Sequence, residues 1–291
     1  MSREALDQQA LRRAFDRAAR TYDEHAVLQR EVADRLIERL IYIKCDPRVI
    51  LDLGSGTGYC SRALADRYKK ARVIGLDLAE GMARYATGRR GWFSRENYAA
   101  ADAEQLPLAD NSVDMVLSSL TFQWCDLGRV FAECRRVLRP GGLLMFTSFG
   151  PTTLQELRAA WAAVDGSVHV HDFQDLRVVG DALVEARLAL PVMDTETITL
   201  TYADVPGVLR DLKMIGATNA AQSRTRGLLG RQRYRTFLDA YEQFRQVDGR
   251  YPASYEIVYG HAWCPDGETQ QPSEPGAGYA SIALDQIGGR K

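Results

Sequence analysis

Apolar residues recur along the chain with two different periods, and their alternation predicts a mixed α/β fold. Between Ala5 and about Ile43 the apolar positions follow the helical repeat, and the run Thr21-Tyr22-Asp23 divides this segment into two predicted helices. A short apolar run, Val49 to Leu53, then enters a glycine-rich turn, and Tyr59 to Tyr68 again shows helical spacing. The chain therefore predicts a strand, a tight turn and a helix directly after its N-terminal helices.

The same alternation continues to about residue 150. Strands are predicted over 72–78, 98–101, 113–119 and 143–148, helices over 81–87 and 127–138, and a turn over 139–142. Strands joined by crossover helices form a parallel sheet with helices on both faces. We therefore expect a doubly wound α/β core over 45–150.

After Pro151 the pattern is less regular. Helices are predicted over 152–164, 180–189, 205–215 and 232–246, and strands over 195–200 and 255–262. A sheet of this type often continues with antiparallel strands at its edge. Residues 265–291 are rich in Pro, Gly, Glu, Gln and Ser, which predicts a flexible tail.

Composition narrows the possible classes of protein. The 291 residues include 37 Lys and Arg against 38 Asp and Glu, a net charge of -1, which argues against a nucleic-acid-binding or membrane-surface protein. No apolar run approaches the roughly 18 residues of a membrane span, and the N-terminus has no signal-peptide core. The five cysteines are an odd number without a C-x-x-C pair, which predicts reduced thiols and a cytoplasmic location.

The strongest motif is Asp52-Leu53-Gly54-Ser55-Gly56-Thr57-Gly58, at the junction of the first strand and its helix. Alternate glycines let the backbone turn sharply and approach a ligand at the carboxyl edge of the sheet. A dinucleotide fingerprint needs G-x-G-x-x-G, whereas here the third glycine comes one residue early. Asp52 would repel a pyrophosphate and attract a cation, so we expect a positively charged nucleoside.

Two further carboxylates follow successive strands. Asp77 closes the second predicted strand and Asp102 follows the third. A carboxylate at the first of these places can accept both hydroxyls of a ribose. Alternatively, Asp77 caps the next helix and Asp102 is a turn residue. Three carboxylates at successive strand ends favour the ligand-binding interpretation.

These features resemble motif I and its companions in the class I S-adenosylmethionine-dependent methyltransferases. The resemblance implies that Asp52 faces the charged end of S-adenosyl-L-methionine, that Asp77 binds the ribose and that Asp102-Ala103 lies at the adenine. It implies a cofactor-binding set of Asp52, Gly54, Ser55, Gly56, Gly58, Asp77, Leu78, Asp102, Ala103 and Ser118. Gln123 and Trp124 are expected along the methyl-transfer corridor, with a core aromatic as the alternative role of Trp124.

Longer runs narrow the resemblance to the malonyl-[acyl-carrier protein] O-methyltransferases of biotin synthesis. They include Phe15 to His25, Leu120 to Leu127, Thr147 to Trp161, Pro191 to Tyr202, Leu209 to Asn219 and Gly249 to Glu256, within about residues 10–264. Ser119 departs from the asparagine of many members, and the tail is longer than usual.

The resemblance implies a Rossmann-like, mostly parallel seven-stranded sheet. The expected organisation is a helical lid over 1–44, a cofactor-binding core over 45–150, acceptor-recognition elements with the last strands over 151–264, and the tail over 265–291. Tyr22 and the lid are expected to close over the cofactor; packing against the sheet edge is the alternative.

The implied acceptor is a malonyl carboxylate, which is already ionised at neutral pH and needs no general base. Catalysis then consists of holding the nucleophile in line and out of water, so no catalytic acid or base is expected. The histidines are expected to be structural or surface residues. His169 and His171 lack a further ligand motif, so no metal is predicted.

An arginine is the natural partner of the acceptor carboxylate because its planar fork binds carboxylates bidentately. The candidates are Arg20, Arg158, Arg210, Arg224 and Arg226. Residues 209–235 carry seven basic side chains and one acid, Asp211, which predicts a docking segment for an acidic acyl carrier protein. A solvated helix face is the alternative for this segment.

Two other functions remain open. One is methyl transfer to another small molecule at oxygen or carbon. The other is a non-catalytic assembly factor that binds S-adenosylmethionine.

Overall fold

The computed structural model describes residues 6–221 and 230–266. Arg224, Arg226 and most of the predicted 265–291 tail lie outside these ranges. The described chain forms one sheet in the order β3-β2-β1-β4-β5-β7-β6. The strands are β1 Val49–Leu53, β2 Arg72–Asp77, β3 Glu96–Ala100, β4 Val113–Ser118, β5 Leu138–Phe149, β6 Ala189–Tyr202 and β7 Tyr251–Trp263.

Strands β1 to β5 pair in parallel, and β7 runs antiparallel to both β5 and β6. The Rossmann-like, mostly parallel, seven-stranded sheet predicted from the sequence is therefore confirmed. The order in which strands are added to the sheet switches sides between β1 and β4, the place where open α/β sheets bind ligands beyond the carboxyl ends of their strands.

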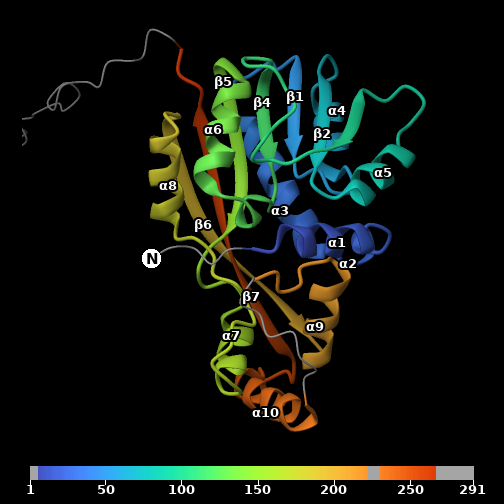
Figure 1. The fold of residues 1–291 in the computed structure, drawn as a ribbon, viewed down its shortest axis with the longest axis vertical. Helices are drawn as coiled ribbons and strands as arrows, with labels where there is room; N and C mark the ends of the chain where they lie inside the picture. Colours follow the sequence, from blue (N-terminus) through green and yellow to red (C-terminus); the bar gives the residue numbers. More distant parts are fainter. Residues whose placement is uncertain (1–5, 222–229, 267–291) are drawn as a thin grey trace, which may run out of the picture.

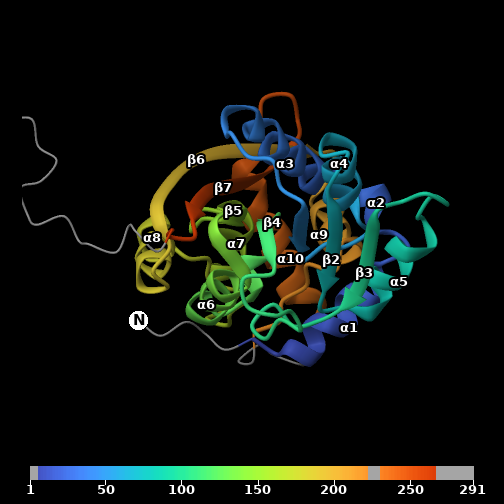
Figure 2. The ribbon, with the colours of Figure 1, turned by 90° about the horizontal axis from the view of Figure 1, so that it is seen from above.

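The helices cover both faces of this sheet (Figure 2). They are α1 Gln8–Ala18, α2 Tyr22–His25, α3 Val27–Glu38, α4 Tyr59–Arg67, α5 Glu80–Gly88, α6 Leu127–Val137, α7 Gln155–Ala162, α8 Leu176–Glu185, α9 Val205–Met214 and α10 Arg231–Tyr241. Three short 3-10 helices are η1 Arg39–Tyr42, η2 Phe122–Trp124 and η3 Glu242–Phe244. Among the described residues, no helix has the length and apolar character needed to cross a membrane.

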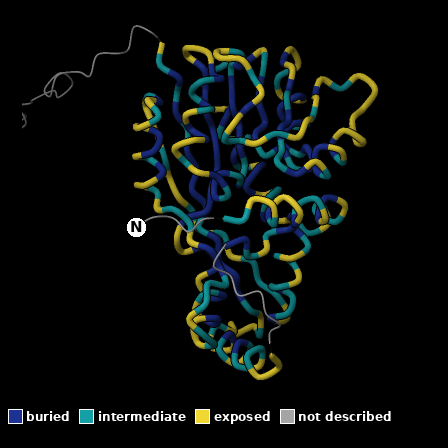
Figure 3. Tube along the Cα trace, viewed as in Figure 1, coloured by how far each residue is buried: buried dark blue, intermediate teal, exposed yellow. Residues whose placement is uncertain are grey.

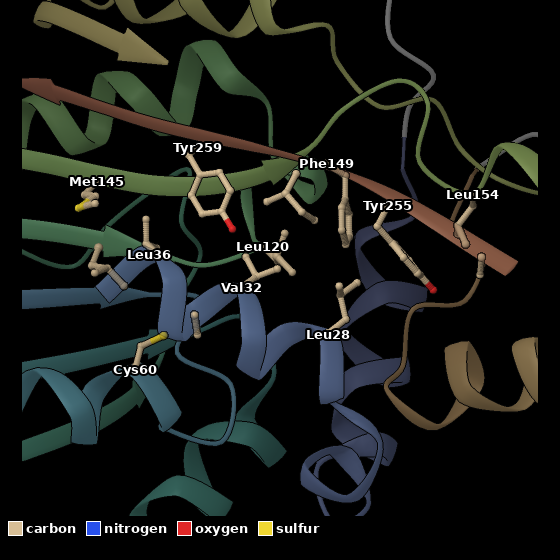
Figure 4. Packing of buried hydrophobic residues seen from close by; sticks show 14 of the residues in the cluster. Leu28, Val32, Leu36, Cys60, Leu120, Met145, Phe149, Leu154, Tyr255 and Tyr259 are labelled. Atoms are coloured by element: carbon tan, nitrogen blue, oxygen red, sulfur yellow. The ribbon is translucent and has the colours of Figure 1, made fainter. Parts of the chain in front are cut away.

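Side chains alternate between two hydrophobic cores along each central strand. In β4, Met115 and Leu117 pack with α3 and α4, whereas Val116 packs with α6 and α8 on the other face. Figure 4 shows Leu28, Val32 and Leu36 of α3 directed toward the sheet in the first of these cores. The period of two, which the sequence analysis used to predict strands, thus produces a core on each face.

The last two strands extend past the others (Figure 1). Strand β7 pairs with β5 from Trp263 to Ile257, but residues 251–256 pair only with β6. This two-stranded extension reaches the group formed by α7, α9 and α10 at the lower end of the molecule. Figure 3 shows buried segments along the extension with exposed turns around it. Buried residues of this lower part, such as Phe237 and Tyr255, belong to the same hydrophobic core as Leu28 of α3.

Predicted boundaries are wrong at α8 and at the start of β5. The helix expected over 180–189 is α8, which begins at Leu176 and ends at Glu185, and Ala189 already belongs to β6. The residues expected as a turn over 139–142 continue β5, because the Gly141 N–H donates to the Cys264 carbonyl and the Cys264 N–H to that of Gly142. In both places the residues that were misassigned pair with the end of β7 or the residue after it: Ala189 with Trp263, and residues 141–142 with Cys264. Local periodicity does not reveal such distant pairing.

Candidate functional site

The turn between β1 and α4 contains three glycines in the left-handed region. Gly54, Gly56 and Gly58 have φ values of 76°, 52° and 82°, which favour glycine because it has no Cβ. The amide N–H groups of Gly54 and Ser55 donate to the Leu76 carbonyl at 2.7 and 3.0 Å. The turn is thereby fastened to β2, and its backbone lines two adjoining cavities at the carboxyl edge of the sheet, which share Gly54, Gly56 and Ser119 and are together called the first cavity.

The three glycines have different surroundings. A Cβ at Gly54 would lie 2.0 Å from Thr121 Oγ1, and one at Gly58 would lie 2.4 Å from Tyr98 Oη. A Cβ at Gly56 would meet nothing within 4 Å, because Gly56 faces the cavity. Gly58, expected to bind the cofactor, is the N-cap residue of α4 and is not part of the cavity wall formed by the described residues.

Asp52 lies on β1 immediately before this turn and is only 1% exposed. The Ser61 hydroxyl donates to its Oδ2 at 2.5 Å. Burial raises the pKa of Asp52 to about 7, although the hydrogen bond from Ser61 acts in the opposite direction. Asp52 lines the cavity beside Ser55 and Gly56, so a cationic ligand there would favour its ionised form.

Asp77 at the end of β2 connects the glycine turn to the start of α5. Its Oδ2 accepts the Gly56 N–H at 2.9 Å and its Oδ1 accepts the Ala79 N–H at 2.8 Å. Burial raises the pKa of Asp77 to about 6. The side chain lines the cavity together with Leu78. Its bond to the Ala79 N–H closes a turn before α5, whose N-cap residue Ala79 has no side-chain cap, so the alternative role of Asp77 as a helix cap is not observed.

Asp102 follows β3 and is exposed at the far side of the same cavity, next to Ala103. Its Oδ1 accepts the Glu104 N–H at 2.9 Å, which closes a turn. The predicted alternative of a turn residue is thus observed. The cavity position is also consistent with the role at the adenine.

The end of β4 departs from the prediction. Ser118 is fully buried and donates from Oγ to the Leu53 carbonyl at 2.8 Å, while the next residue, Ser119, lines the cavity. The Gln123 amide donates to the Leu120 carbonyl at 2.6 Å. In the described parts of the chain, neither Ser118 nor Gln123 belongs to a wall of the cavities discussed here. Both side chains instead hold the backbone of neighbouring cavity residues.

The N-terminal helices cover the cavity. Leu11 and Phe15 of α1 and Tyr22 of α2 form its wall opposite the sheet. Burial, followed by the nearby charge of Asp77, raises the pKa of the Tyr22 hydroxyl. Parts of α1 and α2 thus lie against the cavity, whereas α3, which the expected lid also includes, packs Leu28, Val32 and Leu36 into the core. The closing of these helices over the cofactor stays a prediction.

Side-chain hydrogen bonds from α1, α2 and the residues between them fasten this lid to separate parts of the protein. Asp16 Oδ1 accepts the Gly81 N–H of α5 at 2.7 Å, and Asp23 Oδ1 accepts the Thr57 hydroxyl of the glycine turn at 2.6 Å. Thr21 Oγ1 donates to the Met214 carbonyl of α9 at 3.3 Å. The lid thus touches both the glycine turn and the lower part of the molecule.

A second cavity of about 360 Å³ lies in that lower part. Its wall is mainly apolar, with polar groups at a few positions, and it includes Gln29, Trp124, Phe149, Thr153, Leu154, Leu157, Trp161, Val168, His169, Val170, His171, Phe173, Leu209, Leu212, Lys213, Ile215, Ala217, Thr218, Asn219 and Tyr255. An apolar chamber with few convergent polar groups is typical of a small-molecule site.

Trp124 lies between the two cavities and contributes to the wall of each. On the lid side its ring meets Phe15 edge-on, with centroids 5.8 Å apart, and on the other side it contacts His171 at 4.7 Å. Trp124 is half-buried, so its position is that of a partition between two cavities and not that of a core aromatic.

Comparison with known proteins identifies the family. Residues 51–146 match the family described as "Methyltransferase domain". The malonyl-[acyl-carrier protein] O-methyltransferase of Gallionella capsiferriformans is 51% identical over 272 residues, which are 91% of this chain and 93% of that protein. The protein of the same name from Halorhodospira halophila is 47% identical over 99% of this chain and 97% of its own. The chain belongs to the malonyl-[acyl-carrier protein] O-methyltransferase family.

Solved structures support the same fold at lower sequence identity. The YcgJ protein of Bacillus subtilis is 18% identical, with a TM-score of 0.56, and the match covers 80% of this chain and 98% of that one. A putative methyltransferase of Bacillus halodurans gives the same TM-score and coverage at 16% identity. The methyltransferase fold is thus shared with proteins whose sequences differ widely.

The first cavity fits S-adenosyl-L-methionine, the cofactor of the class I methyltransferases. The buried Ser55 hydroxyl lines it without a hydrogen-bond partner among the described residues, so a ligand could supply one. The open space at Gly56 leaves room for the same ligand. Carboxylates lie along the cavity at Asp52, Asp77 and Asp102, as a molecule with a cationic end, a ribose and an adenine requires.

Of the arginines proposed to bind the acceptor carboxylate, the three that the structure describes, Arg20, Arg158 and Arg210, do not line the second cavity of this methyltransferase. Arg20 and Arg210 are exposed. Arg158 pairs with Asp172 at 2.9 Å and donates to the Val170 carbonyl at 3.2 Å, so it holds the loop after α7. Arg224 and Arg226 lie outside the described residues. Among the described residues, Lys213 is the one lysine or arginine that lines the second cavity.

Sequence reasoning missed Lys213 as an individual candidate and included it only in the basic segment. Lysine was passed over because arginine was preferred for its bidentate geometry, yet Lys213 falls in the run Leu209 to Asn219 that carried the family resemblance. Ser119 was missed as a cavity residue, and Ser118 was named in its place. The period of two shows that neighbouring residues of a strand point to opposite faces, but it does not show which of the two faces a ligand.

Proposed function

We propose that this chain transfers a methyl group from S-adenosyl-L-methionine to the free carboxylate of malonyl-[acyl-carrier protein], giving the malonyl methyl ester that primes pimeloyl synthesis for biotin. The observation that carries the proposal is the second cavity, which adjoins the cofactor cavity across Trp124 and contains one ammonium group in a largely apolar wall. Relatives of this name at 47–51% identity support the acceptor.

The residues of the chain have distinct tasks in this proposal. Asp52, Ser55, Asp77 and Asp102 would hold the cofactor, which supplies an electrophilic methyl group when bound. Trp124 and the lid exclude water from the junction of the cavities. The acceptor carboxylate is ionised at neutral pH, so orientation and desolvation are the contributions required of the protein.

Lys213 is proposed to supply the positive charge that brings the malonyl carboxylate into the apolar cavity. Replacing Lys213 with Met should raise KM for malonyl-[acyl-carrier protein] about tenfold, the effect of losing roughly 1.4 kcal/mol of charge attraction. Lys213→Arg should keep most of the affinity, and the dissociation constant of the cofactor should not change in either variant. An unaltered KM in Lys213→Met would contradict this role.

The basic segment is proposed to dock the acidic carrier protein, and the structure refines which side chains are available. Arg231 and Arg235 are exposed on α10. Arg233 is paired with Asp165, which also accepts from His169 in the cavity wall at 3.0 Å. Reversing Arg233 would therefore disturb the cavity itself, so it is unsuitable for a test of docking.

Reversing the charge of Arg231 and Arg235 together should raise KM for the carrier-bound acceptor roughly 5- to 30-fold, with a smaller effect at high salt. Cofactor affinity and kcat should stay within about twofold. The matched control is reversal of Lys70 and Arg72, which are exposed near the start of β2. Equal KM values for the two double variants would show that α10 is a solvated face without a docking role.

Two other functions compete with the proposal: methylation of another small molecule, and cofactor binding in an assembly factor. Loss of the gene should cause biotin auxotrophy that a monomethyl dicarboxylate relieves if the proposed function is correct. Growth without biotin after loss of this gene, in a cell with no second copy, would favour the competing functions. The cytoplasmic location and the absence of nucleic-acid and membrane partners stay predictions.

A further inference from the structure

His171 lies in the wall of the second cavity, which is called the acceptor cavity from here on. It lies in the loop between α7 and α8, is 6% exposed and forms part of the cavity wall. Its ring centroid is 4.7 Å from that of Trp124 and 4.6 Å from that of Phe173. Because Trp124 also lines the cofactor cavity, His171 lies at the end of the acceptor cavity that meets the cofactor.

The backbone around His171 is held in place from α7. The Arg158 guanidinium donates to the Val170 and His171 carbonyls at 3.2 and 3.5 Å and pairs with Asp172. The contacts with Trp124 and Phe173 restrict the ring itself. An imidazole fixed at both its backbone and its ring is suited to orienting a ligand with little loss of conformational freedom.

The neighbouring His169 is engaged differently. Its Nε2 is 3.0 Å from Asp165 Oδ1, and its ring stacks on Trp161 with centroids 4.0 Å apart and planes 9° apart. It therefore belongs to a stack that continues from Trp161 to Phe237 of α10. The two histidines share a loop and a cavity, but in the contacts described His171 is the one that touches Trp124.

On the basis of the proposed function, we infer that His171 donates a hydrogen bond to the acceptor carboxylate and orients it toward the cofactor. One carboxylate oxygen accepts from the imidazole N–H. The other oxygen forms the new bond to the methyl carbon while the bond between methyl and sulfur breaks. The electron pair of that bond stays on sulfur, and no proton is transferred.

This arrangement answers two physical requirements. A carboxylate that leaves water for an apolar cavity needs a donor in place of its hydration. The negative charge of the carboxylate also disappears as the ester forms, so a full positive charge held directly against it would stabilise the starting state more than the transition state. A single N–H at the junction orients the nucleophile, and the more exposed ammonium of Lys213 serves to attract it.

The test compares three full-length variants with malonyl-[acyl-carrier protein] as acceptor. His171→Phe keeps a ring against Trp124 but removes the donor, and His171→Asn restores an N–H donor in a smaller side chain. His261→Phe is the matched control, because His261 lies on β7 and lines neither of the two cavities formed by the described residues. We expect His171→Phe to lower kcat about 10- to 100-fold, His171→Asn to recover at least a third of the wild-type kcat, and His261→Phe to stay within about threefold.

Cofactor-product affinity and the melting temperature are measured in parallel, and they should change little if the folded cofactor site is intact. Equal kcat values for His171→Phe and the wild type, or for the Phe and Asn variants, would overturn the inference. A wild-type protein that methylates a different acceptor, and not malonyl-[acyl-carrier protein], would instead refute the proposed function.

A direct measurement covers the case in which His171→Phe does not fold. In wild-type protein saturated with cofactor product, the ring nitrogen resonances of His171 should shift when malonyl-pantetheine is added, and those of His169 should shift less. His171→Asn provides the assignment of the signal. Unshifted His171 resonances at saturating acceptor would overturn the inference without reference to activity.

Discussion

Replacing Asp52 with Asn is expected to weaken binding of S-adenosyl-L-methionine about 100-fold or more and to stabilise the protein without cofactor. Asp52 is 1% exposed and lines the cavity beside the glycine turn. Removing one partner of a buried charge pair costs roughly 2–5 kcal/mol of binding. Titration calorimetry with the cofactor, together with melting curves of the free protein, measures both effects.

Through Asp52, the free energy of unfolding of the cofactor-free protein and its affinity for the cofactor should change with pH in opposite directions. The pKa of Asp52 is about 7 in the folded protein, against an ordinary value of 3.8. Between about pH 4 and pH 7 the folded protein holds this proton more tightly than the unfolded chain, so the contribution of Asp52 to the free energy of unfolding falls as pH rises. Cofactor affinity should instead increase from pH 6 to pH 8, because the carboxylate becomes ionised.

In Asp52→Asn, the free energy of unfolding and the cofactor affinity should no longer show the pH dependence that Asp52 causes. Asp77, whose pKa is about 6, should leave a smaller residual dependence at lower pH. The free energy of unfolding of the cofactor-free variant should rise by roughly 1–3 kcal/mol at pH 8. An Asp52→Asn protein that binds cofactor as tightly as the wild type at pH 8 would show that this carboxylate does not face the cationic end.

The second large effect is expected at Gly54. An alanine Cβ at this position would lie 2.0 Å from Thr121 Oγ1 and 2.5 Å from Thr121 Cγ2, and the backbone φ of 76° is unfavourable for alanine. The clash and the backbone strain should together cost about 2–5 kcal/mol of stability. Because Gly54 and Thr121 both line the cofactor cavity, cofactor binding should be lost as well.

Gly56→Ala is the informative contrast. Its Cβ meets no atom within 4 Å and enters the cavity itself, so the cost in stability should be only about 1 kcal/mol for the left-handed backbone. Cofactor affinity should nevertheless fall at least tenfold. Adding Thr121→Gly to Gly54→Ala should restore part of the lost melting temperature. Identical melting temperatures for the two alanine variants would contradict the packing seen at Gly54.

The cofactor site was predictable from the sequence because its chemistry lies in local runs. The glycine turn, Asp52 and the carboxylates after β2 and β3 each sit where a strand ends, and a parallel sheet brings such ends to one edge. The roles of Ser118 and Gln123 were not predictable in this way. Both are polar and adjacent to cavity residues, but each forms a hydrogen bond with a backbone carbonyl that fixes the local turn.

The acceptor cavity was not predictable because distant segments create it. Its walls come from Trp124 of η2, from α7 and the loop after it, from α9 and the residues after it, and from Tyr255 on the part of β7 that pairs only with β6. Lys213 of α9 and His171 of the loop after α7 both line this cavity although they are distant in the sequence. The sequence pattern also placed the start of β6 six residues after its position at Ala189. The sequence favoured arginines as partners of the acceptor carboxylate because of their charge. The structure distinguishes His171 by its contact with Trp124.

The most direct test of the central claim is methyl transfer itself. Purified protein is incubated with malonyl-[acyl-carrier protein] and cofactor carrying a labelled methyl group, with Asp52→Asn as the negative control. The account predicts that label appears on the carrier as an ester that mild base releases as methanol, and that carrier loaded with an acetyl group, which has no free carboxylate, takes up none. Label that appears equally on both carriers, or on neither, would contradict it.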